Sequence, residues 1–162
     1  MQTYTVDIAS EPVTLPIVPI NDTLAISLLM VIDMGVRFGE RIGKAMAAKL
    51  APLRPEIVVG AATLGIPVVI EVSRALGLDQ YVNAQKSPKI HLADALVQEV
   101  HSVTTASKQR LLLDRRSVPL LANRRVVVVD DVVATGSSLA ATFALVRAAG
   151  GEIVGAGVIL TE

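Results

Sequence analysis

The chain has 162 residues with 15 basic and 15 acidic side chains, a length that suggests a single domain with a substantial core. Apolar residues make up 52% of the chain but aromatic residues only 2%, so the core has to be built from aliphatic side chains, as in α/β sheets. The zero net charge gives no global reason to expect DNA or membrane binding, and the absence of cysteine excludes disulfides, thiolate metal sites and cysteine nucleophiles.

The sequence gives no sign of a membrane span or a secretory signal. The longest uncharged apolar stretch, residues 57–70, is interrupted by glycine and proline, and it is shorter than the roughly 20 residues that a helix needs to cross a bilayer. The N-terminal segment carries Asp7 and Glu11 and lacks the basic start of a signal peptide. We therefore expect a soluble, cytoplasmic protein.

The first third of the chain predicts strands followed by one helix. Residues 3–8 alternate weakly and predict an edge strand, whereas residues 13–20 contain two prolines and predict an edge strand or an extended segment. Residues 24–32 fit either a strand or a helix, and we favour the strand because β-branched residues are frequent there. Residues 36–50 predict a helix because large apolar residues recur at four-residue spacing.

The remainder of the chain repeats the order strand, small loop, helix. The expected strands are 56–60, 80–84, 96–103, 108–113, 125–130 and 152–160, and the expected helices are 66–76, one turn within 117–122, and 139–149. Ser137 or Ser138 is expected to cap the last helix. This alternation predicts an α/β fold with a doubly wound, mostly parallel sheet and helices on both faces.

The most informative stretch is residues 125–138, RVVVVDDVVATGSS. Its β-branched run predicts a strand buried on both faces, which should surface at Asp130 and Asp131 because two adjacent carboxylates cannot both be buried cheaply. Residues 134–138 then supply hydroxyl and backbone N–H groups at the start of a helix, where a phosphate can bind. Since the carboxylates suit diol hydroxyls or a hydrated Mg²⁺, the whole stretch predicts a site for a ribose phosphate.

This stretch resembles the phosphoribosyl pyrophosphate (PRPP) binding motif of the type I phosphoribosyltransferases. In that motif four apolar residues, two acids and two apolar residues precede a small-Thr-Gly-small-Ser/Thr loop, and residues 126–139 match every position. The resemblance implies that Asp130 and Asp131 hold the ribose hydroxyls and also a magnesium ion, through water or through the ribose. It implies that the 5′-phosphate is held by the loop Ala134, Thr135, Gly136, Ser137 and Ser138.

The same resemblance gives roles to two further loops. The small loop after the strand at 56–60 corresponds to the one that holds pyrophosphate in these enzymes, and it comprises Ala62, Thr63, Leu64 and Gly65. The segment at about 85–108 resembles their flexible catalytic loop, with Lys86 and Lys89 as catalytic cations for the departing pyrophosphate. Gln85 stands where many relatives carry arginine, so one positive charge is absent there.

The implied activity is transfer of the 5-phosphoribosyl group from PRPP to a nucleobase nitrogen, with Mg²⁺ as cofactor and release of pyrophosphate, in nucleotide salvage. Ala134 stands where hypoxanthine–guanine relatives carry aspartate and looks more like the adenine-type enzymes, so a purine, adenine first, is the expected acceptor. Residues 1–34 resemble the hood, the segment that covers the base in adenine-type members, and residues 35–162 would form the core of this one phosphoribosyltransferase domain. The resemblance also implies a homodimer.

The sequence leaves two alternatives open. The absent charge at Gln85 and the plain loop at 62–65 also suit a regulatory protein that senses PRPP without transferring the phosphoribosyl group. The excess of Lys and Arg between residues 86 and 125 suits an anionic ligand or a solvated basic face. RNA therefore stays open as a partner of residues 108–125, whereas DNA and membrane partners are not expected.

Overall fold

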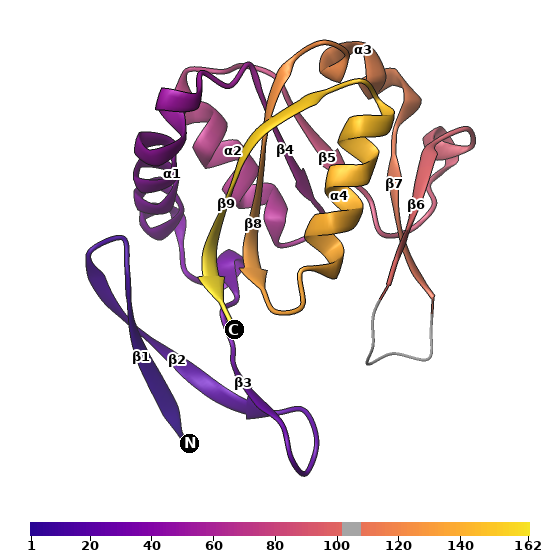
Figure 1. Cartoon of the computed structure of the whole chain (residues 1–162). Coiled ribbons are helices and arrows are strands. Elements are labelled where there is room, and N and C mark those ends of the chain that lie inside the picture. Colours follow the sequence, from indigo (N-terminus) through magenta and orange to yellow (C-terminus); the bar gives the residue numbers. More distant parts are fainter. Residues whose placement is uncertain (102–107) are drawn as a thin grey trace.

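The fold is a computed structural model that describes residues 1–101 and 108–162. The turn expected at 104–107, and the last residues of the strand expected at 96–103, lie outside the described residues. Figure 1 shows a layered α/β core, with a smaller sheet from the N-terminal residues beside it. No helix in the described ranges is long and apolar enough to cross a membrane.

A four-stranded parallel sheet forms the middle layer of the core, in the order β5-β4-β8-β9 (Figure 1). Its strands are β4 (Ile57–Ala61), β5 (Tyr81–Ala84), β8 (Arg125–Val133) and β9 (Glu152–Thr161). Because all the pairings are parallel, the carboxyl ends of the four strands lie at the same edge of the sheet. The predicted fold class, a doubly wound and mostly parallel sheet, is confirmed.

Helices cover both faces of this sheet. The helices are α1 (Val36–Leu50), α2 (Gly65–Leu76), α3 (Val118–Leu121) and α4 (Ser137–Ala148), with short 3₁₀ turns η1 (Val31–Asp33), η2 (Ala51–Leu53), η3 (Ile90–Leu92) and η4 (Arg115–Ser117). Val127 and Val129 of β8 pack in the core formed with α1 and α2, whereas Val126 and Val128 pack in the core formed with α4. The uninterrupted valine run therefore reflects a strand that is buried on both sides.

Two glycines set how closely α2 approaches its neighbours. A Cβ atom at Gly43 of α1 would lie 2.6 Å from the backbone of Glu71 in α2. A Cβ atom at Gly60 of β4 would lie 2.3 Å from the side chain of Val69, also in α2. Since no larger residue fits at either contact without movement, these glycines determine where the N-terminus of α2 lies.

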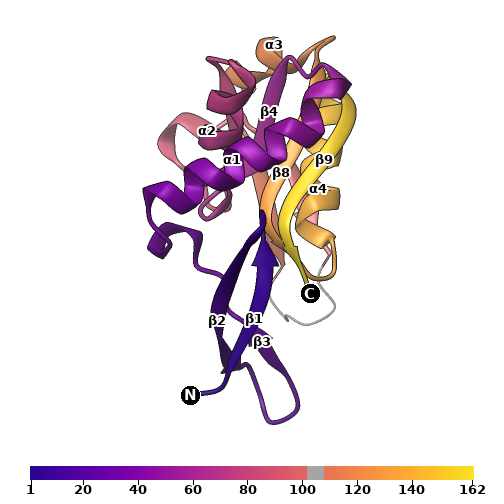
Figure 2. The same ribbon diagram turned by 90° about the vertical axis from the view of Figure 1, so that its left-hand side faces the viewer.

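The N-terminal residues form a separate antiparallel sheet, which extends away from the core (Figures 1 and 2). Its strands are β1 (Thr3–Ile8), β2 (Glu11–Pro19) and β3 (Ala25–Ser27), in the order β1-β2-β3. The strand predicted at 24–32 is thus confirmed only over three residues. The sheet is joined to α1 by an ion pair between Arg41 and Glu11, and Leu15 of β2 is fully buried against the core.

Residues 13–19 are extended, as predicted, but the expectation of an edge strand is wrong, because β2 lies between β1 and β3. Residues 11–16 pair with β1, and residues 17–19 pair with β3. The two neighbours thus cover successive halves of β2, and almost every residue keeps one open side. This arrangement explains why a central strand tolerates proline, which has no N–H group to donate to a second neighbour.

A two-stranded ribbon, β6 (Leu96–Val100) and β7 (Gln109–Leu113), packs against α4. Leu111 and Leu113 are fully buried in the core on that side of the sheet. Gln85, at the end of β5, exchanges two backbone hydrogen bonds of 2.8 Å with Leu112 of β7. The base of the predicted catalytic loop is therefore fixed to the core through β7.

Candidate active site

Three loops that carry the candidate residues meet at one edge of the central sheet. Residues 62–64 follow β4, residues 85–89 follow β5, and residues 134–136 follow β8. Because the carboxyl ends of parallel strands lie together, these loops form one region although they are far apart in sequence. In Figure 1 this edge lies at the lower end of the core, where the arrowheads of β8 and β9 point.

The two aspartates lie within β8 and not at its end, contrary to the expectation that the strand stops at Asp130. The strand continues to Val133 because Asp130, Val132 and Val133 keep their parallel pairing with β9. Asp130 and Asp131 are consequently only partly exposed. The backbone N–H of Asp131 donates a hydrogen bond of 2.9 Å to Oδ1 of Asp130, so the side chain of Asp130 is held in place.

This environment changes the acidity of Asp130. Burial, followed by the hydrogen bond with the Asp131 carboxyl group, raises the pKa of Asp130 from 3.8 to about 7, while the nearby Lys86 cation acts in the opposite direction. Ionisation of Asp130 at neutral pH is therefore costly unless hydroxyl donors or a cation compensate its charge. A partly buried carboxylate with this property is a candidate for a functional role.

The loop after β4 reaches the same carboxylate. Gly65 begins α2, and a Cβ atom at this position would lie 3.2 Å from Oδ1 of Asp130. The loop is held by a hydrogen bond of 2.8 Å from the N–H of Ala62 to the carbonyl oxygen of Ala84, and the Ala62–Thr63 peptide bond is cis. Thr63 is exposed and Leu64 is half-buried. The small loop after β4 thus lies next to the acidic pair of β8.

The loop at 134–138 forms the N-terminus of α4. The prediction that Ser137 or Ser138 caps this helix is wrong, because the helix begins at Ser137 and Gly136 is the capping position. Gly136 has φ of 82°, a left-handed conformation that favours glycine, and no atom lies within 4 Å of the position of an added Cβ. Thr135 Oγ1 and Ser137 Oγ are 2.7 Å apart, so their hydroxyl groups converge on the open start of the helix.

An open pocket of about 300 Å³ lies beside this loop and extends to β6. Gln98 and His101 line it together with residues 135–137. The sequence reasoning missed Gln98, although a signal was present. Along β6 the more buried positions are Leu96, Gln98 and Val100, so a polar residue occupies the apolar side of an alternating strand. Such a residue indicates that this side of β6 faces a polar space, and Gln98 indeed lines the pocket beside the helix N-terminus.

The two candidate lysines differ in position. Lys86 lies close enough to Asp130 to oppose the rise in its pKa. Lys89 is exposed immediately before η3, and among the residues that the structure describes no ion pair or hydrogen bond joins it to the two aspartates. The structure therefore brings Lys86, and not Lys89, to the acidic pair.

Part of the basic excess between residues 86 and 125 is neutralised locally. Arg116 is bound to Asp114 at 2.7 Å and lowers the pKa of that carboxyl group through its hydrogen bonds. Arg115 lies 3.5 Å from a carboxylate oxygen of Asp94. Arg125 lies 3.7 Å from a carboxylate oxygen of Glu152. This pairing favours a solvated face over an RNA-binding surface.

The acidic pair also fits a magnesium ion that is completed by substrate. Within residues 1–101 and 108–162, no three His, Cys, Asp or Glu side chains are grouped to hold a metal by themselves. Magnesium commonly keeps water ligands and binds through one or two carboxylates together with phosphate oxygens. Asp130 and Asp131 supply two such carboxylates at the carboxyl edge of the sheet.

The parallel α/β sheet thus carries a helix N-terminus, an acidic pair and a second small loop at its carboxyl edge. Residues 38–162 match the family model described as phosphoribosyl transferase domain, and the chain belongs to this family. Its α/β sheet and flanking helices agree with the fold of solved members.

The chain is 29% identical over 131 residues to a xanthine phosphoribosyltransferase of Laribacter hongkongensis, covering 80% of this chain and 68% of that protein. It is 37% identical over 105 residues to an adenine phosphoribosyltransferase of Parasynechococcus marenigrum, covering 64% of this chain and 56% of that protein. The chain therefore spans only about half to two thirds of the length of these relatives.

Among solved structures, adenine phosphoribosyltransferase from Saccharomyces cerevisiae, complexed with an imino-altritol bisphosphate and adenine, superposes with a TM-score of 0.75. The match covers 91% of this chain and 84% of that chain at 18% sequence identity. This likeness shows a shared fold.

Proposed function

We propose that the chain transfers the 5-phosphoribosyl group of PRPP to a ring nitrogen of a nucleobase and releases pyrophosphate. The observation that carries this proposal is the contact between the loop after β4 and the acidic pair, in which the Cβ position of Gly65 lies 3.2 Å from Oδ1 of Asp130. One sheet edge would thereby bind a phosphate, a diol and a second phosphate group. Membership of the phosphoribosyl transferase domain family supports the proposal.

The residues would divide the binding of PRPP between them. The 5′-phosphate lies on residues 134–138, where the N-terminus of α4 offers backbone N–H groups and the hydroxyls of Thr135 and Ser137 converge. The ribose diol donates hydrogen bonds to Asp130 and Asp131. The pyrophosphate group lies against residues 62–65 at the N-terminus of α2. A magnesium ion bound by the two aspartates and by substrate oxygens would neutralise charge on the pyrophosphate.

Reaction breaks the bond between C1 of the ribose and the pyrophosphate oxygen, which keeps the electron pair. Positive charge develops at C1 in the oxocarbenium-like transition state, and the ring nitrogen of the base discharges it by forming the new bond to C1. The proton of that ring nitrogen is released to solvent. Lys86 and Lys89 stabilise the negative charge that grows on the departing pyrophosphate. Because these groups act by charge and position, the mechanism needs no protein nucleophile. The role proposed for the catalytic loop at about 85–108 is to keep water from C1.

A purine, adenine first, is the acceptor we propose. Ala134 is small and exposed at the end of β8, which leaves room beside the ribose site. Residues 1–34, which contain the N-terminal sheet, would act as the hood over the base, and residues 35–162 would form the core of the same domain. The named relatives act on different bases, xanthine and adenine, so the identity of the base rests on these features of the chain.

The proposal is tested by measuring pyrophosphate release from PRPP and Mg²⁺ with adenine, hypoxanthine, guanine, xanthine and orotate. We expect turnover with a purine, fastest with adenine, and none in a variant that combines Asp130→Asn with Asp131→Asn. PRPP binding without turnover on any base would favour a PRPP-sensing regulatory protein. Unchanged PRPP affinity in the double variant would refute the assignment of the site itself.

A further inference from the structure

A hydrogen bond between the N-terminal sheet and the end of the core sheet is a feature of the fold that the proposed reaction does not use. Ser27 of β3 donates a hydrogen bond of 2.8 Å to Oε1 of Glu162, the residue after β9. The two residues are 135 positions apart in the sequence, and Figure 1 shows the end of β9 beside β3. The contact therefore marks the place where the two sheets meet, at the carboxyl edge of the core.

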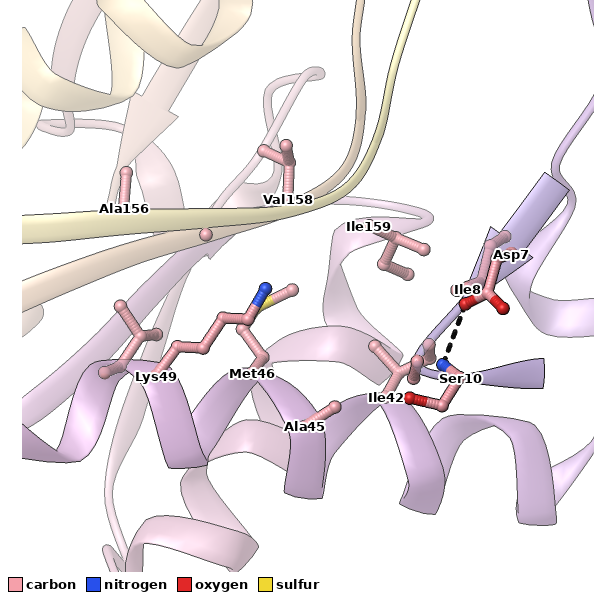
Figure 3. Close-up of a pocket in the computed structure, with 13 residues that line it drawn as sticks. Asp7, Ile8, Ser10, Ile42, Ala45, Met46, Lys49, Ala156, Val158 and Ile159 are labelled. Atoms are coloured by element: carbon pink, nitrogen blue, oxygen red, sulfur yellow. Dashed lines mark hydrogen bonds between the residues drawn. The ribbon is translucent and has the colours of Figure 1, made fainter.

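The N-terminal sheet is also held to the core at its other end. The β1–β2 hairpin borders a pocket of about 510 Å³ between α1 and β9, where the N–H of Ser10 donates a hydrogen bond of 3.0 Å to Oδ1 of Asp7 (Figure 3). Ile8 of this hairpin is buried in the core, and Arg41 of α1 forms the ion pair with Glu11. The position of the N-terminal sheet therefore does not depend on Glu162 alone.

The pairing of β9 with β8 places Glu162 beyond the proposed ribose site. Thr161 pairs with Val133, and the N–H of Glu162 donates a hydrogen bond of 2.9 Å to the carbonyl oxygen of Val133. Glu162 is therefore level with Ala134, the small residue beside which the base has room. At about 3.3 Å per residue, this level is roughly 10 Å along the strand from Asp131, within reach of a base whose ribose is held there.

The carboxylate of Glu162 has capacity to accept further hydrogen bonds. Glu162 is exposed, and Ser27 bonds to only one of its two carboxylate oxygens. Within residues 1–101 and 108–162, no lysine or arginine forms an ion pair with it. Because a carboxylate accepts hydrogen bonds and donates none, it favours an N–H group on a neighbouring base and opposes a carbonyl oxygen at the same place.

We infer that Glu162 is a specificity-determining residue that selects purines carrying an exocyclic amino group over their oxo counterparts, an inference that rests on the proposed transferase function. A purine that reacts at its ribose-bearing nitrogen turns the opposite edge away from C1, towards Glu162. Adenine and guanine have an amino group on that edge, and hypoxanthine and xanthine have an oxygen at the corresponding position. That oxygen would face the carboxylate without a donor between them. An anionic base such as orotate would be repelled by its charge.

The test compares kcat/KM within two pairs of bases, adenine with hypoxanthine and guanine with xanthine, in which oxygen replaces an amino group. We expect the wild type to prefer the amino base of each pair by at least about ten-fold, and Glu162→Gln to reduce this preference to less than about three-fold. Glu162→Lys should reverse the preference, because an ammonium group donates to oxygen. Glu152→Gln is the matched control, because Glu152 is an exposed glutamate at the opposite end of β9, and it should keep the preference. Ser27→Ala removes the hydrogen bond but leaves the carboxylate, so it should also keep the direction of the preference.

Nucleotide binding tests the role of Glu162 without turnover. Calorimetry of adenosine against inosine monophosphate, and of guanosine against xanthosine monophosphate, measures the effect of the same replacement of an amino group by oxygen. The wild type should again prefer the amino member, and Glu162→Gln should lose that preference, while thermal unfolding of each variant checks that the fold is kept.

Absence of turnover with every base would refute the proposed transferase function, and the nucleotide affinities would then decide the inference about Glu162. Absent or equal affinities within each pair, or a preference that Glu162→Gln leaves unchanged, would overturn it. A loss of preference as large in Ser27→Ala as in Glu162→Gln would also overturn it, because Glu162 would then act only by joining the two sheets.

Discussion

Replacing Asp130 by asparagine should stabilise the ligand-free protein at alkaline pH while removing PRPP binding. Burial and the carboxyl group of Asp131 raise the pKa of Asp130 from 3.8 to about 7. The unfolded chain therefore loses this proton at lower pH than the folded chain, and stability falls as the pH rises from the unfolded pKa through the folded pKa. Asparagine keeps an acceptor oxygen for the N–H of Asp131 but cannot ionise, so the variant avoids this loss.

The expected change in the free energy of unfolding follows from the shift in the pKa of Asp130. A rise of about three pKa units corresponds to a destabilisation of up to about 4 kcal/mol above pH 7, at about 1.4 kcal/mol per unit. Asp130 keeps some contact with solvent, so we expect a gain of roughly 1–3 kcal/mol in the variant. For a chain of this size that gain raises the Tm by about 3–10 °C.

Thermal unfolding in the presence of a chelator, at about pH 4 and about pH 8, measures this difference. The gain should be present at the higher pH and largely absent at the lower one. Asp114→Asn is the matched control, because the hydrogen bonds from Arg116 lower the pKa of Asp114 and reverse the sign of the effect. Equal stabilisation by Asp130→Asn at both pH values, or destabilisation at the higher one, would refute the reasoning from burial.

Three further predictions concern the loops and the N-terminal sheet. Gly136→Val should cost about 1–2 kcal/mol of stability at a φ of 82° and weaken PRPP binding at least ten-fold in calorimetry, whereas unchanged affinity would place the phosphate elsewhere. Lys86→Ala should lower kcat more than PRPP affinity, because pyrophosphate gains charge only as the bond breaks; a loss confined to affinity would make Lys86 a ground-state contact. Arg41→Ala removes the ion pair with Glu11 and should raise KM for the base more than KM for PRPP, and equal effects on both would contradict a hood role.

The stretch from residue 125 to residue 138 could be interpreted from sequence because its signals are local. A valine run buried on both faces, two acids and a small loop each depend on neighbouring residues alone. The end of β8 could not be predicted in this way, because the strand continues past Asp130 only through its pairing with β9. The helix start was also missed, since Gly136 occupies the capping position in a left-handed conformation and no side chain caps the helix.

The other features that could not be predicted from sequence depend on contacts between segments that are distant along the chain. The approach of Gly65 to Asp130 depends on the packing of α2 against β4, and no spacing in the sequence reports it. The two prolines in residues 13–20 correctly indicated that the strand has open sides. The prolines did not predict that β1 and β3 would each pair with a different half of β2.

The close crossing of α1 and α2 at Gly43 has a consequence for how this chain tolerates mutation. An alanine there would press on the backbone of Glu71 at 2.6 Å and displace α2. Since a helix moves largely as a rigid rod, the shift would reach Gly65 at its N-terminus and change the contact with Asp130. In a library of random variants selected for growth on a salvaged base, position 43 should therefore be depleted as strongly as residues of the loops, although it lies on α1, which supplies none of the proposed ligand-binding groups.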